Sequence, residues 1–172
     1  MLKLCKIGEY MQEVAKNFGQ ICLKNKLVVC TAESCTAGLI SATIASVPNS
    51  SSWLECGFVV YSADAKNKVL GVKLDTIEKF NITSVQVASE MALGALDRCN
   101  CNVSIAVTGV AGPSGASEDI PVGTVCIAFA YKNKNGDIEL KSSKQFFDGD
   151  RNTIRQKVVI YCLEHIIKKY EL

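Results

Sequence analysis

Two kinds of hydrophobic spacing alternate along the chain. Apolar residues recur every three or four positions in segments that also carry charge, as with Val14, Phe18 and Cys22, and this spacing predicts helices with one buried face. Short aliphatic runs without charge lie between them, which is typical of strands buried in a sheet. The predicted helices span residues 7–26, 36–46, 62–69 and 85–97, with a last one from Asp150 to the C-terminus. The predicted strands span residues 27–31, 53–61, 103–107, 124–131 and 138–147.

Strands that alternate with helices predict a three-layer α/β domain. The Asn135-Gly136 turn joins two neighbouring strands as a hairpin, so at least one strand runs antiparallel and the sheet is mixed. The chain shows no internal repeat and no linker. We therefore expect a single domain over residues 1–172.

The charges of the chain nearly balance, because 19 Lys and Arg face 17 Asp and Glu for a net charge of +2. This balance lacks the basic surface that binding to nucleic acid or an anionic membrane requires, so we expect neither partner. No apolar run reaches the ~18 residues of a membrane span. Residues 1–17 also lack the continuous apolar segment of a signal peptide, and we expect a cytoplasmic protein.

Nine cysteines accompany a single histidine, His165. No C-x-x-C pair occurs, and the closest two, Cys99 and Cys101, are spaced wrongly for a structural zinc site. An odd number of cysteines without a signal peptide also disfavours a disulfide scaffold. We expect no metal, and cysteines that act as small hydrophobic side chains in a reducing compartment.

The first polar loop after a predicted strand carries Ser34 and Cys35, directly before the predicted helix 36–46. Free backbone N–H groups at a helix start can stabilise an anion, as the reaction of a serine nucleophile requires. The alternative is an ordinary helix cap, for which Ser and Thr are preferred. To act as the attacking group, Cys35 would need a paired base, and only His165 in the C-terminal helix is available. We therefore assign Cys35 to the pocket wall.

A second loop, residues 61–66, offers a candidate base for Ser34. A single histidine gives little support to a Ser-His-Asp arrangement, and a lysine is the usual substitute. Lys66 lies one helical turn after Ser62, and a lysine becomes a base when burial lowers its pKa towards neutrality. The alternative is a solvated surface lysine.

A third loop, residues 108–123, contains four glycines but matches neither phosphate-binding pattern, G-x-x-x-x-G-K-[ST] or G-x-G-x-x-G. Its glycines could let backbone N–H groups approach a ligand, or the segment could be a tight surface loop. Its length without regular structure is typical of functional loops. Arg151 has the planar fork that suits a phosphate, the alternative being a surface ion pair.

Taken together, these motifs resemble the CinA C-terminal domain family of nicotinamide-nucleotide amidases, also called competence/damage-inducible proteins. The resemblance covers roughly residues 8 to 170, in family order. Its motifs are TAESCTAG at 31–38, YSADAK at 61–66 followed by LGV at 70–72, AVTGVAGP at 106–113, PVGT at 121–124 and GDR at 149–151.

The resemblance implies an α/β/α sandwich with a mixed, about five-stranded sheet. It also implies deamidation of nicotinamide mononucleotide to nicotinic acid mononucleotide and ammonia, without metal or organic cofactor, by a homo-oligomer. Ser34 matches the family's nucleophile and Lys66 its general base, while Tyr61 and Thr108 match positions that complete the polar site. We also expect substrate contacts from residues in or beside these motifs, namely Glu33, Cys35, Thr36, Ala37, Gly38, Gly57, Gly109, Gly112 and Arg151.

The chain departs from the family pattern in its glycines. Ala37 and Cys56 stand where the family commonly has Gly, and the third loop carries Ser114 and the acidic pair Glu118-Asp119. These changes concern substrate affinity more than chemistry. Three other functions remain open: a nucleotide-binding module without turnover, a phosphate-transfer or nucleotide-hydrolysing enzyme, and an amidase for another substrate.

Overall fold

The structure is a computed structural model that describes the backbone of residues 2–171 and the side chains of residues 6–171. The helices are α1 (Leu2–Asn25), α2 (Leu39–Ala45), α3 (Ala63–Leu70), α4 (Leu74–Phe80), α5 (Val85–Arg98) and α6 (Arg151–Tyr170), with a short 3₁₀ turn η1 (Ser50–Ser52). The strands are β1 (Val29–Glu33), β2 (Leu54–Val59), β3 (Val103–Gly109), β4 (Thr124–Lys132) and β5 (Ile138–Phe146).

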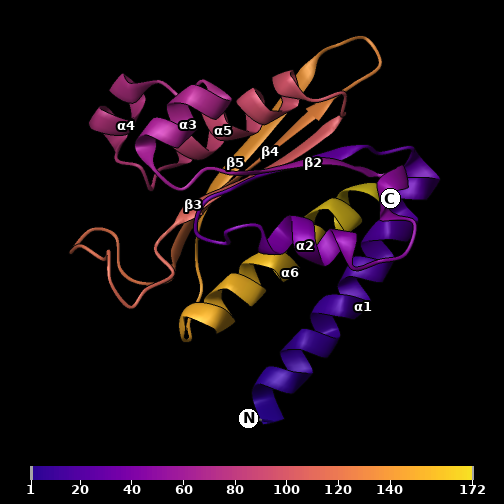
Figure 1. The fold of residues 1–172 in the computed structure, drawn as a ribbon, viewed down its shortest axis with the longest axis horizontal. Helices are drawn as coiled ribbons and strands as arrows, with labels where there is room; N and C mark the ends of the chain where they lie inside the picture. The colour runs from indigo at the N-terminus through magenta and orange to yellow at the C-terminus, as the bar shows by residue number, and fades with distance from the viewer. Residues whose placement is uncertain (1, 172) are drawn as a thin grey trace.

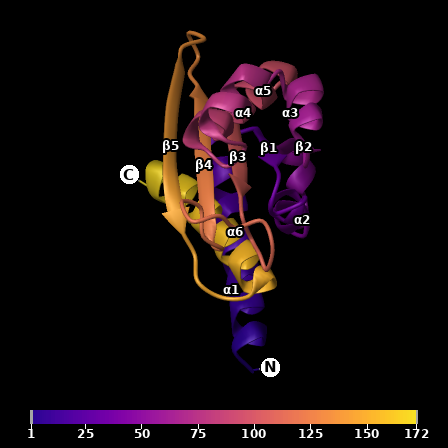
Figure 2. The same cartoon turned by 90° about the vertical axis from the view of Figure 1, so that its left-hand side faces the viewer.

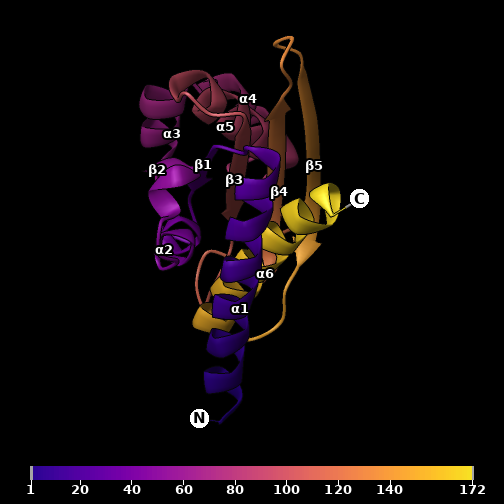
Figure 3. The same cartoon turned by 90° about the vertical axis from the view of Figure 1, so that its right-hand side faces the viewer.

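The strands form one mixed sheet in the order β2-β1-β3-β4-β5. β1 pairs in parallel with β2 and with β3, whereas β3 with β4 and β4 with β5 pair antiparallel. Helices α3, α4 and α5 cover one face, and α1, α2 and α6 cover the other (Figure 1; Figures 2 and 3 show the sheet from either side). The predicted three-layer α/β/α sandwich with a mixed five-stranded sheet is confirmed.

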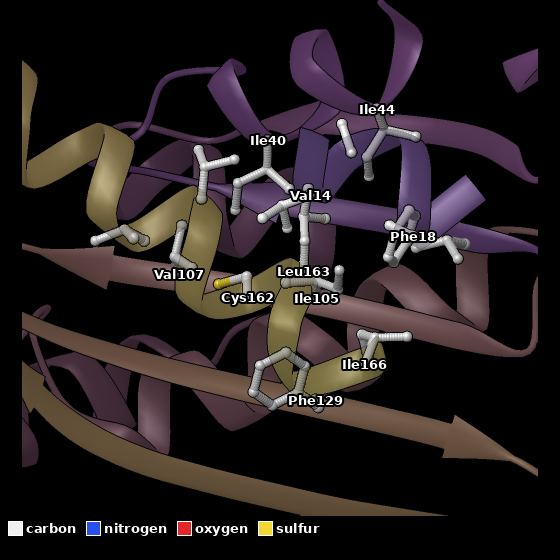
Figure 4. Packing of buried hydrophobic residues seen from close by; sticks show 14 of the residues in the cluster. Val14, Phe18, Ile40, Ile44, Ile105, Val107, Phe129, Cys162, Leu163 and Ile166 are labelled. Carbon is white, nitrogen blue, oxygen red and sulfur yellow. The ribbon is translucent and has the colours of Figure 1, made fainter. Parts of the chain in front are cut away.

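The two faces of the sheet bury side chains of different size. Large aliphatic residues such as Ile105 and Val107 pack with α1, α2 and α6, and Figure 4 shows them in the same cluster as Phe18 and Leu163. The opposite face presents small residues of β4, Cys126, Ala128 and Ala130, to α5. Small side chains let α5 lie close to the sheet, so several cysteines serve as core filling there.

The region around Ser34 differs from the sequence prediction. β1 continues to Glu33, because the polar side chains of Thr31 and Glu33 are buried with hydrogen-bond partners. The following helix begins at Leu39 rather than at residue 36. Ala37 (φ 49°) and Gly38 (φ 88°) are both left-handed, which a right-handed helix cannot include.

Helix α4 was not predicted as an element of its own. It has seven residues and buries none of them fully, so it leaves no periodic apolar signal in the sequence. Ser62 and Ser84 cap α3 and α5, since their side chains accept from the backbone N–H of Ala65 and Val87. Ser62 thereby fixes the start of α3, the helix that carries Lys66.

No helix within residues 2–171 is both long and apolar enough to cross a membrane. Among the described side chains, no group of three or more His, Cys, Asp or Glu residues is arranged to hold a metal ion. The cysteines from Cys22 onward are free thiols.

Candidate active site

The amine of Lys66 lies directly against the hydroxyl of Ser34. The distance from Nζ to Ser34 Oγ is 2.9 Å, and Nζ also donates to the carbonyl oxygens of Val60 (2.8 Å) and Tyr61 (3.2 Å). Ser34 follows β1 and Lys66 lies in α3, which follows β2, so the parallel pairing of β1 and β2 brings both to the same sheet edge. Lys66 is 0% exposed and Ser34 is 7% exposed.

This geometry suits a neutral lysine that accepts a proton. A neutral amine has two N–H groups and one lone pair; the two carbonyls can take the N–H groups, which leaves the lone pair for the Ser34 hydroxyl. Burial lowers the pKa of Lys66 to about 8. At that pKa roughly a tenth of the enzyme carries neutral Lys66 at pH 7.

A cavity of about 330 Å³ opens above Ser34, between the ends of the strands, the glycine-rich loop and the start of α6. The expected residues at its wall are Ser34, Cys35, Tyr61, Thr108, Gly109, Gly112 and Arg151. Lys66 lies behind Ser34 and does not line the cavity. The site therefore places a buried base behind a hydroxyl that faces a small-molecule pocket.

Arg151 joins three parts of this wall. Its guanidinium donates to the carbonyl of Gly112 in the glycine-rich loop (2.8 Å) and to the hydroxyl of Tyr61 (3.0 Å). A guanidinium has five N–H groups, and these two bonds leave others for a ligand. Tyr61 is 57% exposed, so its ring stands at the mouth of the cavity.

Thr108 closes the cavity at the end of β3. Its hydroxyl donates to the carbonyl of Ile82 (2.9 Å), which ties β3 to the connection between α4 and α5. Asn81, Ile82 and Thr83 of that connection also line the cavity. No site role was expected for these residues, because they match no motif and lie at least twenty residues before β3.

The glycine-rich loop, residues 108–123, supplies further wall residues that were expected only as part of the loop and not individually. These are Val110, Ala111, Ser114, Gly115, Ser117 and Ile120. The only signal that could have found them was the loop's length and glycine content, which mark the segment but not its members.

Several expected substrate contacts do not line the cavity, namely Glu33, Thr36, Ala37, Gly38 and Gly57. The Glu33 carboxylate accepts from Ile40 N (3.0 Å) and Ser41 N (2.9 Å), and Thr36 O accepts from Arg155 (2.7 Å). Gly57 lies against Ser41, whose Oγ would be only 2.8 Å from a Cβ at this position. These residues shape the segment that carries Ser34.

The backbone around Ser34 limits which groups can stabilise an oxyanion. The N–H of Ser34 donates to Val107 O (3.0 Å), and the N–H groups of Ile40 and Ser41 in α2 are occupied by Glu33. Burial raises the pKa of the Cys35 thiol to about 12, and the nearby backbone N–H groups of Cys35 and Thr36 offset only part of this rise. Cys35 is thus a protonated thiol at neutral pH, which disfavours it as a nucleophile.

His165 takes no part in this site. Its ring stacks on Phe129, with centroids 4.0 Å apart, in the layer between α6 and the sheet, and it does not line the cavity. Burial lowers its pKa, which favours the neutral form. The base in reach of Ser34 is Lys66.

The chain is similar to known proteins over most of its length. The family model of the CinA C-terminal domain matches residues 11–170. A nicotinamide-nucleotide amidohydrolase PncC from Enterobacter agglomerans is 42% identical over 142 residues, which cover 83% of this chain and 84% of the relative. The protein of the same name from Escherichia coli K12 is 35% identical over 93% of this chain and 94% of its own length. A CinA-like protein from Fervidobacterium nodosum is 44% identical over 145 residues, which cover 84% of this chain and 34% of that longer protein.

Solved structures agree with the sequence relatives. The crystal structure of the competence/damage inducible protein CihA from Agrobacterium tumefaciens superposes with a TM-score of 0.84 at 39% identity, covering 92% of this chain and 94% of the other. The competence-damaged protein (CinA) superfamily protein from Escherichia coli gives a TM-score of 0.85 at 31% identity, covering 92% and 90%.

Proposed function

This chain belongs to the CinA C-terminal domain family, and on that premise we propose that it is a nicotinamide-nucleotide amidase. The reaction is hydrolysis of the carboxamide of nicotinamide mononucleotide to nicotinic acid mononucleotide and ammonia. The observation that carries the proposal is the 2.9 Å contact between Lys66 Nζ and Ser34 Oγ at the wall of a small cavity. Amidohydrolases that match this chain over nearly their whole length support the reaction class.

Acylation starts with the direct transfer of the Ser34 proton to neutral Lys66, across the 2.9 Å contact. Ser34 Oγ then attacks the carboxamide carbon, and the N–H groups of Cys35 and Thr36 stabilise the oxyanion. In a well-studied hydrolase, one such donor is worth about 3–4 kcal/mol. Two carbonyls hold the amine of Lys66 in place, so the proton transfer needs no rearrangement.

Collapse of the tetrahedral intermediate releases ammonia. Protonated Lys66 gives its proton to the leaving nitrogen and becomes neutral again, so it can activate the water that hydrolyses the acyl-enzyme. The second product is the pyridine carboxylate, and Ser34 is regenerated. No group outside this chain is needed for the proton transfers.

The nucleotide portion of the substrate lies along the glycine-rich loop. Gly109 and Gly112 present backbone to the cavity, because a Cβ at either position would point into the protein, 2.6 Å from Thr124 O and from Val122 Cγ1 respectively. Arg151 contributes positive charge and free N–H groups for the phosphate. We place the protein in the cytoplasm, where free thiols such as those of Cys22 and Cys162 persist.

The test is ammonia release by the purified protein with nicotinamide mononucleotide, beside the Ser34→Ala and Lys66→Ala variants. We expect release by the native protein and loss of at least 10³-fold in kcat for each variant, because the members of such a pair act as a unit. Thermal unfolding of Ser34→Ala should match that of the native protein. Full activity of Ser34→Ala would sink the scheme.

A further inference from the structure

Glu33 is a buried carboxylate directly before Ser34, and the reaction scheme gives it no step. It is the last residue of β1, and its side chain is 0% exposed. It does not line the cavity. Its side chain therefore lies within the protein, while Ser34, the next residue along the chain, faces the cavity.

Five donors converge on this carboxylate. Three are hydroxyls, those of Thr31 (3.1 Å), Thr36 (2.7 Å) and Ser41 (2.9 Å). Two are the backbone N–H groups of Ile40 (3.0 Å) and Ser41 (2.9 Å) in the first turn of α2. An ionised carboxylate has acceptor sites only, so it matches a ring of donors that a neutral amide cannot match.

The carboxylate joins both ends of the segment that carries the nucleophile. Residues 34–38 leave β1 at Glu33, turn through the left-handed residues Ala37 and Gly38, and enter α2. Gly38 provides no side-chain cap, and Glu33 takes that role from the strand end. The segment is thus closed as a loop whose two ends meet at one side chain.

Two further contacts hold the same loop from outside. Ser34 N donates to Val107 O in β3 (3.0 Å), and the Arg155 guanidinium of α6 donates to Thr36 O (2.7 Å). Within the segment, Leu39 N donates to Thr36 O (3.1 Å) and Ala42 N to Gly38 O (2.9 Å), which are local bonds between the loop and α2. The bonds to the Glu33 side chain are those that tie the start of α2 back to the end of β1. Loss of the bonds to Glu33 would loosen α2 and its loop from the end of β1, so that Ser34 Oγ could shift relative to Lys66 Nζ.

We propose that Glu33 is a positioning residue, whose carboxylate fixes the loop 34–38 so that Ser34 Oγ and the oxyanion donors keep their alignment with Lys66. The proposal rests on the proposed function in that Ser34 is the nucleophile. It assigns Glu33 no contact with the substrate, in contrast to the sequence expectation.

The test is Glu33→Gln, which keeps the size of the side chain but turns one oxygen into an NH₂ group that faces N–H and O–H donors. We expect kcat to fall ~10- to 100-fold, because displacement of a reacting group by about 1 Å can cost 10²-fold. KM should stay within about threefold, because Glu33 does not touch the substrate. The pH midpoint of the remaining activity should stay near that of the native enzyme.

Glu90→Gln is the matched control. Glu90 of α5 clamps the start of α4 in the same way, by accepting from Lys73 N (2.7 Å) and Thr76 Oγ1 (2.7 Å), and it does not line the cavity. The same chemical change there should lower the melting temperature and leave kcat and KM unchanged. An equal fall of kcat in both variants, or a rise of KM in Glu33→Gln without a fall of kcat, would overturn the proposal.

Ser41→Ala decides the question if Glu33→Gln does not fold. It removes one hydroxyl donor from the carboxylate, and we expect a fall of kcat of about two- to fivefold with KM unchanged. Unaltered kcat in a folded Ser41→Ala variant contradicts the proposal.

Labelling of Ser34 by a fluorophosphonate probe, followed by mass spectrometry, separates this proposal from the proposed function. If the native protein is labelled but releases no ammonia, the substrate assignment fails. Slower labelling of Glu33→Gln or Ser41→Ala would then still support the positioning role, and equal labelling would refute it. A native protein that neither labels nor releases ammonia overturns both.

Discussion

At the scale of single residues, the chemistry depends on how burial changes Lys66. An exposed lysine is protonated at neutral pH and cannot take a proton from a serine. Lys66 is fully buried, so water does not solvate its amine, and two backbone carbonyls hold the amine against Ser34. Desolvation and orientation thus turn an ordinary residue type into a base.

The pH dependence of catalysis follows from the pKa of about 8 at Lys66. Neutral Lys66 is the active form, so kcat/KM should rise about tenfold per pH unit below pH 8 and level off above it. Initial rates of ammonia release between pH 6.5 and 10 check this. A flat profile over that range would exclude Lys66 as the base.

Substitution of Ala37 tests whether the backbone of the loop 34–38 is strained. Its φ of 49° is left-handed, which costs a residue with a Cβ about 1–2 kcal/mol. Ala37→Gly should therefore raise the free energy of unfolding by up to about 1 kcal/mol, part of the gain being offset by the entropy of glycine in the unfolded chain. Urea denaturation measures the change.

Ala42→Gly is the control for Ala37→Gly, and we expect it to change the stability in the opposite direction. Ala42 is exposed in the right-handed helix α2, where glycine is about 1 kcal/mol less favourable than alanine. A loss of stability in both variants would show that Ala37 is not strained.

At the scale of elements, α3, the helix that carries Lys66, packs closely against α5. Gly94 of α5 makes this possible, because a Cβ at this position would lie only 1.9 Å from the backbone oxygen of Leu70 at the end of α3. The contact depends on a missing side chain, so a methyl group at Gly94 has to push the two helices apart.

We expect Gly94→Ala to lower the free energy of unfolding by about 1–3 kcal/mol, the usual cost of overpacking. It should also lower kcat, since α3 carries Lys66. Gly8→Ala is the control, because nothing lies within 4 Å of a Cβ there. That change in α1 should stabilise by roughly 0.5–1 kcal/mol in urea denaturation.

The start of α6 and the glycine-rich loop form the nucleotide end of the site. Arg151→Lys would lose the fork that reaches Gly112 O and Tyr61 Oη together. We expect KM for nicotinamide mononucleotide to rise about tenfold, with kcat within threefold. With nicotinamide riboside, which has no phosphate, the native protein and the Arg151→Lys variant should have the same KM. Equal changes for both substrates would place Arg151 away from the phosphate.

At the scale of the whole molecule, the edge strands β2 and β5 each pair on one side only within residues 2–171. The edge strand β5 carries the exposed apolar residues Ile138, Leu140 and Phe146. Open edges and exposed apolar side chains favour association between chains. We expect a homo-oligomer, and light scattering coupled to size exclusion at micromolar concentration measures its mass. A single species of 18.6 kDa would contradict this prediction.

The architecture was largely predictable from the sequence, and its gaps have local causes. The periodic segments of α1, α5 and α6 and the aliphatic runs of β3 and β4 each bury a defined face, so their pattern predicts them. Helix α4 has no buried residue and so no pattern. The helix expected after Ser34 begins later than predicted, because Ala37 and Gly38 form a left-handed turn before it. An Ala-rich sequence gives no sign of such a turn.

The sequence by itself determined the chemistry that is present: a serine after a strand, a lysine one turn into the following helix, a glycine-rich loop, and one histidine. Only the tertiary structure decided which of these groups meet. Parallel pairing of β1 and β2 brings Ser34 to Lys66, and burial makes that lysine a base. Likewise, Glu33 was expected to contact the substrate, and its carboxylate instead lies inside the protein and accepts from the first turn of α2, at the end of the loop 34–38. The physical reason is that pKa values and hydrogen-bond partners depend on distances between segments far apart in the chain, which local sequence does not encode.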